Sequence, residues 1–254
     1  MLCITLSLSV ALATPRAEPI SWANGGTSFA GYLVYDDATA TRRPGLLMVP
    51  NWMGVTPAAV EKAQKIAGTR YVVLVADVYG KDLRPANDDE ASKAAGALYE
   101  DRPLLRARVN AALRTLQAQS GTTPLDATHI GAIGFCFGGS TVLELARSGT
   151  PLDGVVSFHG GLATPSPAGK GALHTPVLVL NGAADSYVPP KDIGAFQTEL
   201  DTSGADWQFV QFSGAVHCFT EPAAASPGCR YDARTAARAY GMMNDFFTET
   251  FAAP

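Results

Sequence analysis

Short apolar runs alternate with amphipathic, helix-like stretches along most of this chain. Apolar or alternating runs predict strands over residues 28–36, 45–49, 71–76, 129–133, 154–158, 176–180 and 207–212. Helical spacing predicts helices over residues 57–69, 90–100, 102–119, 141–147, 191–201 and 232–250. Strands that alternate with helices are typical of a mostly parallel sheet with helices on both faces, so we expect an α/β fold.

The first residues follow a different pattern. Residues 2–12 are apolar and rich in hydroxyl side chains, and Ala11-Leu12-Ala13 has the small-x-small form of a signal-peptidase site. The run is too short to serve as a membrane anchor. We therefore expect a signal peptide over 1–13 and a periplasmic or secreted location, although no lysine or arginine precedes the run. The alternative is a frayed extension on a cytoplasmic protein.

No repeat or long linker divides the chain after this leader, so residues 14–254 should form a single domain.

A glycine-flanked turn separates the strand at 129–133 from the helix at 141–147. Its sequence, Gly134-Phe135-Cys136-Phe137-Gly138, fits the nucleophile elbow G-x-S-x-G of α/β hydrolases, with Cys136 in the serine position. The glycines allow the strained backbone of such a turn. The helix N-terminus that follows favours negative charge, and therefore a thiolate. The alternative is a buried structural cysteine beside a glycine turn.

Two later loops supply candidate partners for Cys136. In α/β hydrolases the chain order is nucleophile, acid, histidine. Asp185 follows the strand at 176–180, and His217 follows the strand at 207–212. Because the carboxyl ends of parallel strands meet at one edge of a sheet, these side chains should lie together. Asp192 is a weaker candidate for the acid, and Asp185 and His217 could instead be a turn aspartate and a solvated histidine. His159 ends its own strand and could line the pocket.

Acyl transfer also needs two hydrogen-bond donors for the oxyanion that forms on the carbonyl oxygen. The backbone N–H of Phe137, the residue after the elbow cysteine, is one candidate. The other should come from the loop after the strand at 45–49, which reads Pro50-Asn51-Trp52-Met53-Gly54. We assign it to the N–H of Trp52, whose side chain would also wall the pocket unless it belongs to the core.

Composition narrows the classes of function. The chain has 47% hydrophobic and 17% charged residues and a net charge of −4, with no basic cluster that would suit nucleic acid. Its sequence has no metal-ligand spacing and no phosphate-binding glycine loop, so we expect neither metal nor cofactor.

Cys218 and Cys229 could form a disulfide in an oxidising compartment, or both could stay reduced.

With these residues in hand, the chain resembles the dienelactone hydrolase family of α/β hydrolases. The resemblance extends from about Gly31 to Phe247. It implies an α/β-hydrolase fold and a monomeric, cofactor-free enzyme that cleaves ester or lactone bonds of small molecules through a thioester acyl-enzyme. The matched segments are 50–54, 76–80, 134–139, 181–185 and 217–219.

The chain also departs from the family pattern. Family members often carry a glutamate where this chain has Asn51, and that glutamate tunes the resting cysteine. Dienelactone-cleaving members bind the substrate carboxylate with two arginines, whose positions here hold Lys81 and Glu221. Lysine lacks the bidentate fork of arginine, and glutamate would repel a carboxylate. We therefore expect a neutral or bulkier ester rather than dienelactone, contacted by Asn51, Tyr79, Lys81 and His159.

Two other classes of protein would fit the same scaffold. One is an enzyme of different specialisation, such as a thioester- or peptide-cleaving hydrolase. The other is a non-catalytic binding module, an idea that the non-ionisable Asn51 makes credible. Because candidates fill all three positions of a Cys-His-Asp triad, we favour the ester hydrolase.

Overall fold

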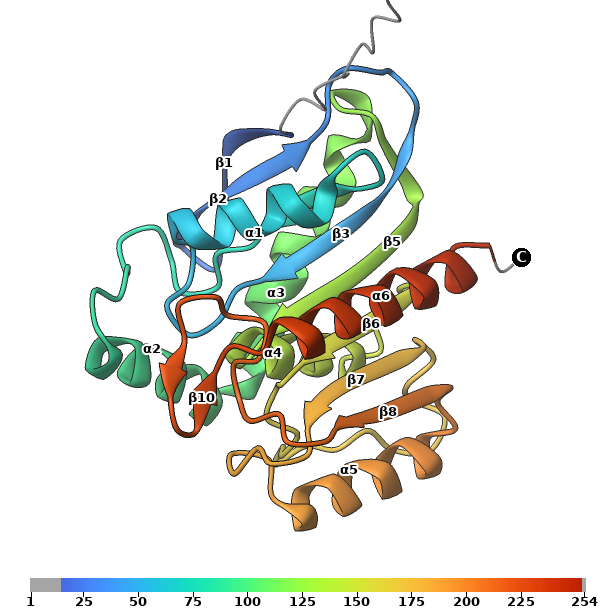
Figure 1. The fold of residues 1–254 in the computed structure, drawn as a ribbon. Helices are drawn as coiled ribbons and strands as arrows, with labels where there is room; N and C mark the ends of the chain where they lie inside the picture. Colours follow the sequence, from blue (N-terminus) through green and yellow to red (C-terminus); the bar gives the residue numbers. More distant parts are fainter. Residues whose placement is uncertain (1–14, 253–254) are drawn as a thin grey trace, which may run out of the picture.

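An eight-stranded sheet runs through the molecule, and the computed structural model describes residues 15–252 (Figure 1). In spatial order the strands are β1 (Arg16–Asn24), β2 (Thr27–Tyr35), β4 (Val72–Val75), β3 (Arg43–Val49), β5 (Leu125–Phe135), β6 (Gly154–Phe158), β7 (Val177–Gly182) and β8 (Trp207–Phe212). The pairs β1–β2 and β2–β4 are antiparallel, and all pairs from β4 to β8 are parallel. The predicted parallel sheet is confirmed. The predicted signal peptide, residues 1–13, lies outside the described residues.

Helices cover both faces of this sheet, as predicted. Two of them, α1 (Pro57–Ala67) and α6 (Ala233–Thr250), contribute to the core on one face. The other face is covered by α2 (Asp88–Glu100), α3 (Arg102–Gln117), α4 (Phe137–Arg147) and α5 (Pro190–Ser203). A short 3₁₀ helix, Ala118–Gly121, follows α3.

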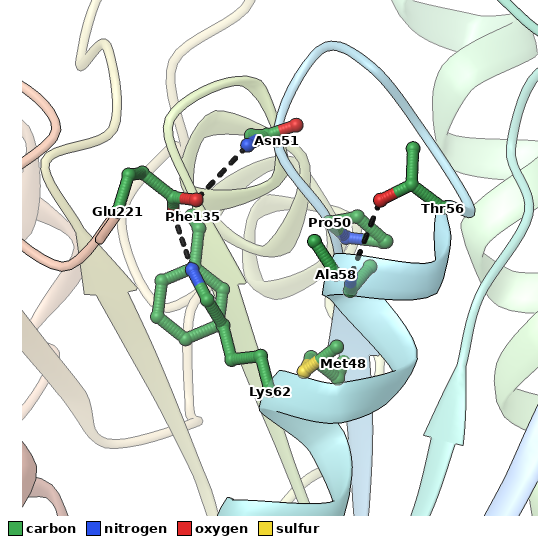
Figure 2. A pocket seen from close by; sticks show the side chains of 9 residues that line it. Met48, Pro50, Asn51, Thr56, Ala58, Lys62, Phe135 and Glu221 are labelled. Atoms are coloured by element: carbon green, nitrogen blue, oxygen red, sulfur yellow. Dashed lines mark hydrogen bonds and ion pairs between the residues drawn. The ribbon is translucent and has the colours of Figure 1, made fainter. Parts of the chain in front are cut away.

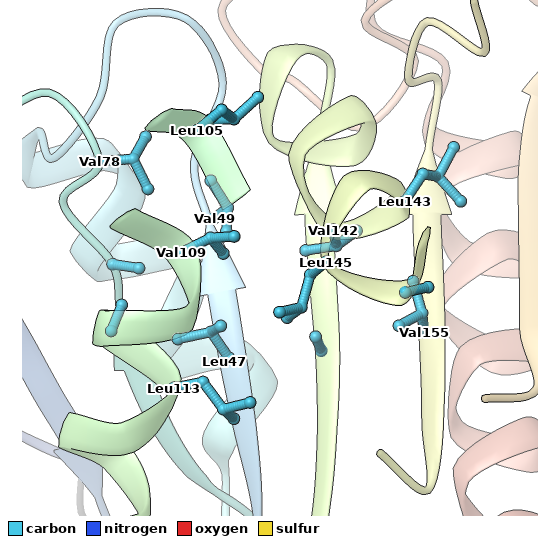
Figure 3. Packing of buried hydrophobic residues seen from close by; sticks show 14 of the residues in the cluster. Leu47, Val49, Val78, Leu105, Val109, Leu113, Val142, Leu143, Leu145 and Val155 are labelled. Atoms are coloured by element: carbon cyan, nitrogen blue, oxygen red, sulfur yellow. The ribbon is translucent and has the colours of Figure 1, made fainter. Parts of the chain in front are cut away.

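The central strands are apolar on both faces because both faces are buried. In β3, Leu46 and Met48 pack into the core beside α1 and α6, whereas Leu47 and Val49 point to the opposite core. Figure 3 shows this second core, in which the apolar side chains of α3 face those of β3. The period of two along each strand thus explains the continuous apolar runs.

Side-chain caps fix where the helices begin. The hydroxyl of Thr56 accepts from the N–H of Ala59 at the start of α1, and Pro57 occupies the first helical position, as predicted. Asn87, Asp101 and Asp232 cap α2, α3 and α6 in the same way. Each cap satisfies a backbone N–H that has no partner within its helix.

Two differences from the predicted elements have local causes. Strand β1 was not predicted, because Arg16, Glu18 and Pro19 interrupt its apolar pattern; as the first strand of the sheet it tolerates proline and is mostly half-exposed. The antiparallel pair β9 (Ala225–Ser226) and β10 (Cys229–Arg230) was also missed, because strands of two residues carry no periodic signal. Within residues 15–252, no helix has the length and apolarity needed to cross a membrane.

Candidate active site

Cys136 stands between two regular elements, since β5 ends at Phe135 and α4 begins at Phe137. Its φ of 55° lies in the left-handed region, which non-glycine residues rarely adopt and which typically costs about 1–3 kcal/mol. Two hydrogen bonds hold this backbone: the N–H of Cys136 donates to Phe158 O at 3.0 Å, and its carbonyl accepts from Ser140 N–H at 3.1 Å. This is the strained strand-to-helix turn that the sequence predicted.

Close backbone packing explains both glycines of the elbow. A Cβ at Gly134 would lie 2.0 Å from the carbonyl oxygen of Gly138, and a Cβ at Gly138 would lie 2.0 Å from the carbonyl oxygen of Val49. No real Cβ atom tolerates such distances. The two glycines therefore let α4 start immediately after Cys136 and lie against the end of β3.

His217 and Asp185 lie on the loops that follow β8 and β7. Nδ1 of His217 and Oδ2 of Asp185 are 2.7 Å apart. The other carboxylate oxygen of Asp185 accepts from the N–H of Tyr187 at 2.9 Å, which fixes the carboxylate plane. Asp192, the alternative acid, lies in the first turn of α5 and does not hydrogen-bond the imidazole. The structure thus pairs His217 with the predicted residue.

The environment of His217 favours its protonated form. Burial alone would lower its pKa, but hydrogen bonds to Asp185 and Cys136, together with the negative charge on those groups, raise the pKa to about 10. Asp185 and Cys136 therefore both act on the same imidazole. The three residues predicted to act as nucleophile, acid and histidine are therefore brought together.

The predicted oxyanion donors, Trp52 and Phe137, both line the cavity beside Cys136. The loop that carries Trp52 is held on two sides. The carbonyl of Trp52 accepts from the hydroxyl of Tyr79 at 2.9 Å, and the N–H of Met53 donates to Oδ1 of Asn51 at 3.1 Å. The ring of Tyr79 also stacks on Phe137, with ring centres 5.4 Å apart. These contacts fix the loop against the start of α4.

A cavity of about 520 Å³ opens beside the elbow, which is large enough for a small-molecule substrate. Its wall is mostly apolar and aromatic, with Arg102 and Asp192 as its charged members besides His217. The lining residues are Trp52, Ala95, Tyr99, Arg102, Cys136, Phe137, Ser140, Gly161, Leu162, Ala163, Tyr187, Asp192, His217, Cys218 and Cys229.

The residues predicted to contact substrate do not line this cavity; they are Asn51, Tyr79, Lys81 and His159. Asn51 and Tyr79 support the Trp52 loop instead, through the hydrogen bonds given above. The side chain of Lys81 is half-exposed and pairs with Asp82 at 2.6 Å. Lysine has a long, strongly hydrated side chain, so it is drawn to the exposed carboxylate next to it.

His159 is fully buried at the end of β6. Its Nε2 lies 2.7 Å from the hydroxyl oxygen of Thr220, and its ring packs edge-on against that of His217, with ring centres 5.0 Å apart. Burial, with the nearby charges of His217 and Lys62, holds its pKa well below the usual range. His159 is therefore a neutral packing partner of His217.

A second, smaller pocket lies under the Trp52 loop (Figure 2). Here Lys62 of α1 forms an ion pair with Glu221, whose other oxygen accepts from Nδ2 of Asn51 at 3.1 Å. The ammonium group also lies 4.0 Å from the centre of the Phe135 ring. Burial lowers the pKa of Lys62, while Glu221 and Cys136 oppose that shift. Sequence reasoning missed Lys62, because a lysine on an amphipathic helix normally faces solvent.

Cys218 and Cys229 form a disulfide, which settles the question that the sequence left open. The bond joins the loop of His217 to the β9–β10 hairpin, and both cysteines line the cavity. His217 also pairs with Cys229 in an isolated β-bridge, and its carbonyl accepts from the N–H of Arg230 at 2.9 Å. Cys136 remains a free thiol. Within the described part of the chain, no cluster of three His, Cys, Asp or Glu side chains could hold a metal ion.

Known proteins resemble this chain in both sequence and fold. A model of the dienelactone hydrolase family matches residues 29–251. Two solved structures each have a TM-score of 0.87 and cover 94% of this chain and 99% of their own: m3DLH, at 36% identity, and the dienelactone hydrolase-like promiscuous phosphotriesterase P91 from metagenomic libraries, at 35%. A "Probable 2-oxo-3-(5-oxofuran-2-ylidene)propanoate lactonase" from Bradyrhizobium sp. is 26% identical over 215 residues, which cover 80% of this chain and 84% of that protein.

Proposed function

The chain belongs to the dienelactone hydrolase family, whose members are hydrolases of the ester and lactone type, and we propose that it cleaves these bonds with Cys136 as the nucleophile. His217 acts as the general acid and base, and Asp185 orients its imidazole and stabilises the protonated form. The observation that supports this most is the contact of His217 with both Asp185 and Cys136 at one cavity.

Acylation begins with attack of the Cys136 thiolate on the carbonyl carbon of the substrate. A C–S bond forms, and the carbonyl π electrons move to oxygen, where the N–H groups of Phe137 and Trp52 donate to the oxyanion. The tetrahedral intermediate then collapses, and the C–O bond to the leaving group breaks. The imidazolium of His217 gives its proton to the departing alkoxide, which leaves a thioester on Cys136 and a neutral imidazole.

Deacylation runs through the same groups. Neutral His217 takes a proton from a water molecule, whose oxygen attacks the thioester carbon. The second tetrahedral intermediate expels the Cys136 thiolate and releases a carboxylic acid. The imidazolium formed in this step restores the resting pair, so no outside reactant other than water is consumed.

We further propose that dienelactone itself is not the substrate. In this chain Lys81 pairs with Asp82, and Glu221 pairs with Lys62 and Asn51. Neither position supplies a cationic fork to the cavity. From the sequence, we expected the negative charge of Glu221 to repel a substrate carboxylate. The ion pair of Glu221 with Lys62 reduces that repulsion.

The proposal is tested with the purified protein and a panel of p-nitrophenyl esters, lactones, thioesters, amides and a p-nitrophenyl phosphotriester. We expect esters or lactones to be the best substrates, and Cys136→Ala to abolish their turnover. The phosphotriester is included because the similar protein P91 is described as a promiscuous phosphotriesterase. A wild-type protein that turns over no member of the panel would favour a non-catalytic role, and preferred thioester or amide cleavage would favour the other alternative.

We also propose that the protein works outside the cytoplasm. The Cys218–Cys229 disulfide supports this location, because such bonds persist in oxidising compartments. Cell fractionation with N-terminal sequencing tests it: an exported protein should begin near residue 14. Full-length protein with reduced thiols in the cytoplasm would contradict the proposal.

A further inference from the structure

Arg102 is an unusual charged residue in the wall of the cavity that holds Cys136. It begins α3 and is only 8% exposed. Its Nη2 donates to the carbonyl oxygen of Ala163 at 3.3 Å, whereas Nε and Nη1 are buried without a hydrogen-bond partner among residues 15–252. Its guanidinium lies 4.4 Å from the centre of the Tyr99 ring. Buried donors without acceptors are costly, so they call for an explanation.

Neighbouring carboxylates do not serve Arg102, because other arginines already use them. Nε of Arg106 donates to one oxygen of Glu144 at 2.8 Å, and Nη1 of Arg147 donates to the other at 3.0 Å. Arg147 also forms two hydrogen bonds of 2.8 Å with Glu199. Two arginines therefore occupy both glutamates, and the charge of Arg102 is left without an ion-pair partner in the described part of the chain.

The remaining charged wall residue does not neutralise Arg102 either. Asp192 comes from α5 and forms no ion pair with Arg102 among residues 15–252. Arginine keeps its charge in such surroundings. A planar guanidinium with free N–H groups matches a carboxylate or phosphate, whose paired oxygens accept two parallel hydrogen bonds.

We propose that Arg102 binds an anionic oxygen group, a carboxylate or a phosphate, on the ester that enters the cavity. This inference rests on the proposed function and names the class of its substrates. It differs from the neutral ester expected from sequence, because Arg102 lies on α3, away from the two positions that hold Lys81 and Glu221. Since the two unpartnered nitrogens are covered, the side chain must turn toward the cavity to reach the anion.

The test compares matched esters that differ in charge. Mono-p-nitrophenyl adipate and p-nitrophenyl hexanoate have the same acyl chain length, and a phosphonate-ended analogue distinguishes phosphate from carboxylate. A carboxylate on the leaving phenol, against its methyl ester, shows on which side of the ester the anion lies. For the wild type we expect the best anionic ester to exceed its neutral partner in kcat/KM by about 10- to 100-fold, the range for hydrogen bonds to charged groups.

Variants assign this preference to one side chain. Arg102→Met should abolish the preference, measured as the ratio of kcat/KM for the anionic ester to that for the neutral ester, and Arg102→Lys should keep part of it. Arg114→Met is the matched control, because it removes the same charge from an exposed position of the same helix. It should change neither substrate. A preference that survives in Arg102→Met, or that is equally lost in Arg114→Met, overturns the inference.

A second measurement uses only the wild-type protein and does not depend on turnover. Adipate should slow the alkylation of Cys136 by neutral iodoacetamide in the wild type, and adipamide, its uncharged diamide, should not. If no ester is cleaved but adipate protects Cys136, the proposed function fails and the anion site stands. If p-nitrophenyl hexanoate is cleaved and neither adipate protection nor any anionic preference is seen, the function stands and the anion site is wrong.

Discussion

The amide of Asn51 donates from Nδ2 to Oε2 of Glu221 across 3.1 Å, and so joins the loop after β3 to the chain just beyond His217. The same carboxylate forms an ion pair with Lys62 of α1. Both charged side chains are mostly buried, at 14% and 17% exposure. Two loops that carry proposed catalytic groups are therefore fastened to one helix through a single carboxylate.

Removing one member of this buried ion pair should destabilise the fold. Lys62→Met leaves the Glu221 carboxylate buried without its cation, and we expect a loss of about 3 kcal/mol in the free energy of unfolding. Urea denaturation measures it. The double variant Lys62→Met/Glu221→Gln should recover most of that loss, since it buries no unpaired charge. Equal losses in the single and double variants would show that charge pairing does not stabilise this region.

The pairing of His217 with Asp185 predicts a large kinetic effect. Asp185→Asn removes the negative charge that orients the imidazole and stabilises its protonated form. We expect kcat for a p-nitrophenyl ester to fall about 10⁴-fold, by analogy with serine triads. Asp192→Asn provides the comparison, because Asp192 lies on the cavity wall and does not hydrogen-bond the imidazole. We expect it to lose less than about 10-fold. The opposite ranking would make Asp192 the orienting acid.

Stability should depend on pH through His217. Its pKa is raised from 6.5 to about 10 in the folded protein, so the folded state holds a proton that the unfolded chain releases. The resulting stabilisation is fully present below pH 6.5 and is lost as the pH rises through 10. Urea denaturation at several pH values should show this decline in the wild type and a flatter curve in His217→Gln. Parallel curves for both proteins would argue against the raised pKa.

The disulfide should stabilise both the fold and the position of His217. The bond closes a loop with a sequence separation of 11 residues, for which chain entropy gives about 3 kcal/mol. Cys229→Ser should lower the melting temperature and the esterase activity, and a reducing agent should have the same effect on the wild type. The variant itself should not respond to the reducing agent. A wild type whose melting temperature and activity are unchanged after verified reduction would contradict this role.

Two glycines give opposite predictions for the same substitution. Gly134→Ala places a Cβ 2.0 Å from the carbonyl of Gly138, and we expect a loss of about 3 kcal/mol or more together with the activity. Gly96 lies in α2 with open space around its Cβ position, so Gly96→Ala should stabilise by up to about 1 kcal/mol. Similar effects at both positions would mean that the elbow is not tightly packed.

Sequence patterns predicted the features of this protein that repeat or follow a fixed motif. Apolar runs marked the strands from β3 to β7, an alternating pattern marked β8, and the glycines around Cys136 marked the elbow. Asp185 and His217 could be found because chain order and strand ends locate them. Each of these signals is local in the sequence or follows from the topology of a parallel sheet.

Other features could not be predicted because they depend on distant contacts. Lys62 and Arg102 look like ordinary helix-surface cations, and only tertiary packing shows that both are mostly buried. Lys81, which the family resemblance pointed to, turns instead to the carboxylate of Asp82. Whether Cys218 and Cys229 pair depends on the distance between two loops, which their spacing in the sequence does not fix.

The central claim, that Cys136 attacks the substrate and carries its acyl group, is tested most directly by trapping the intermediate. The wild type is mixed with excess p-nitrophenyl butanoate, quenched in acid within milliseconds and analysed by mass spectrometry of its peptides. The account predicts one butanoyl group on the peptide that contains Cys136, labile to hydroxylamine as a thioester, and none in Cys136→Ala. Undiminished turnover by Cys136→Ala, or an acyl group on another residue, would contradict it.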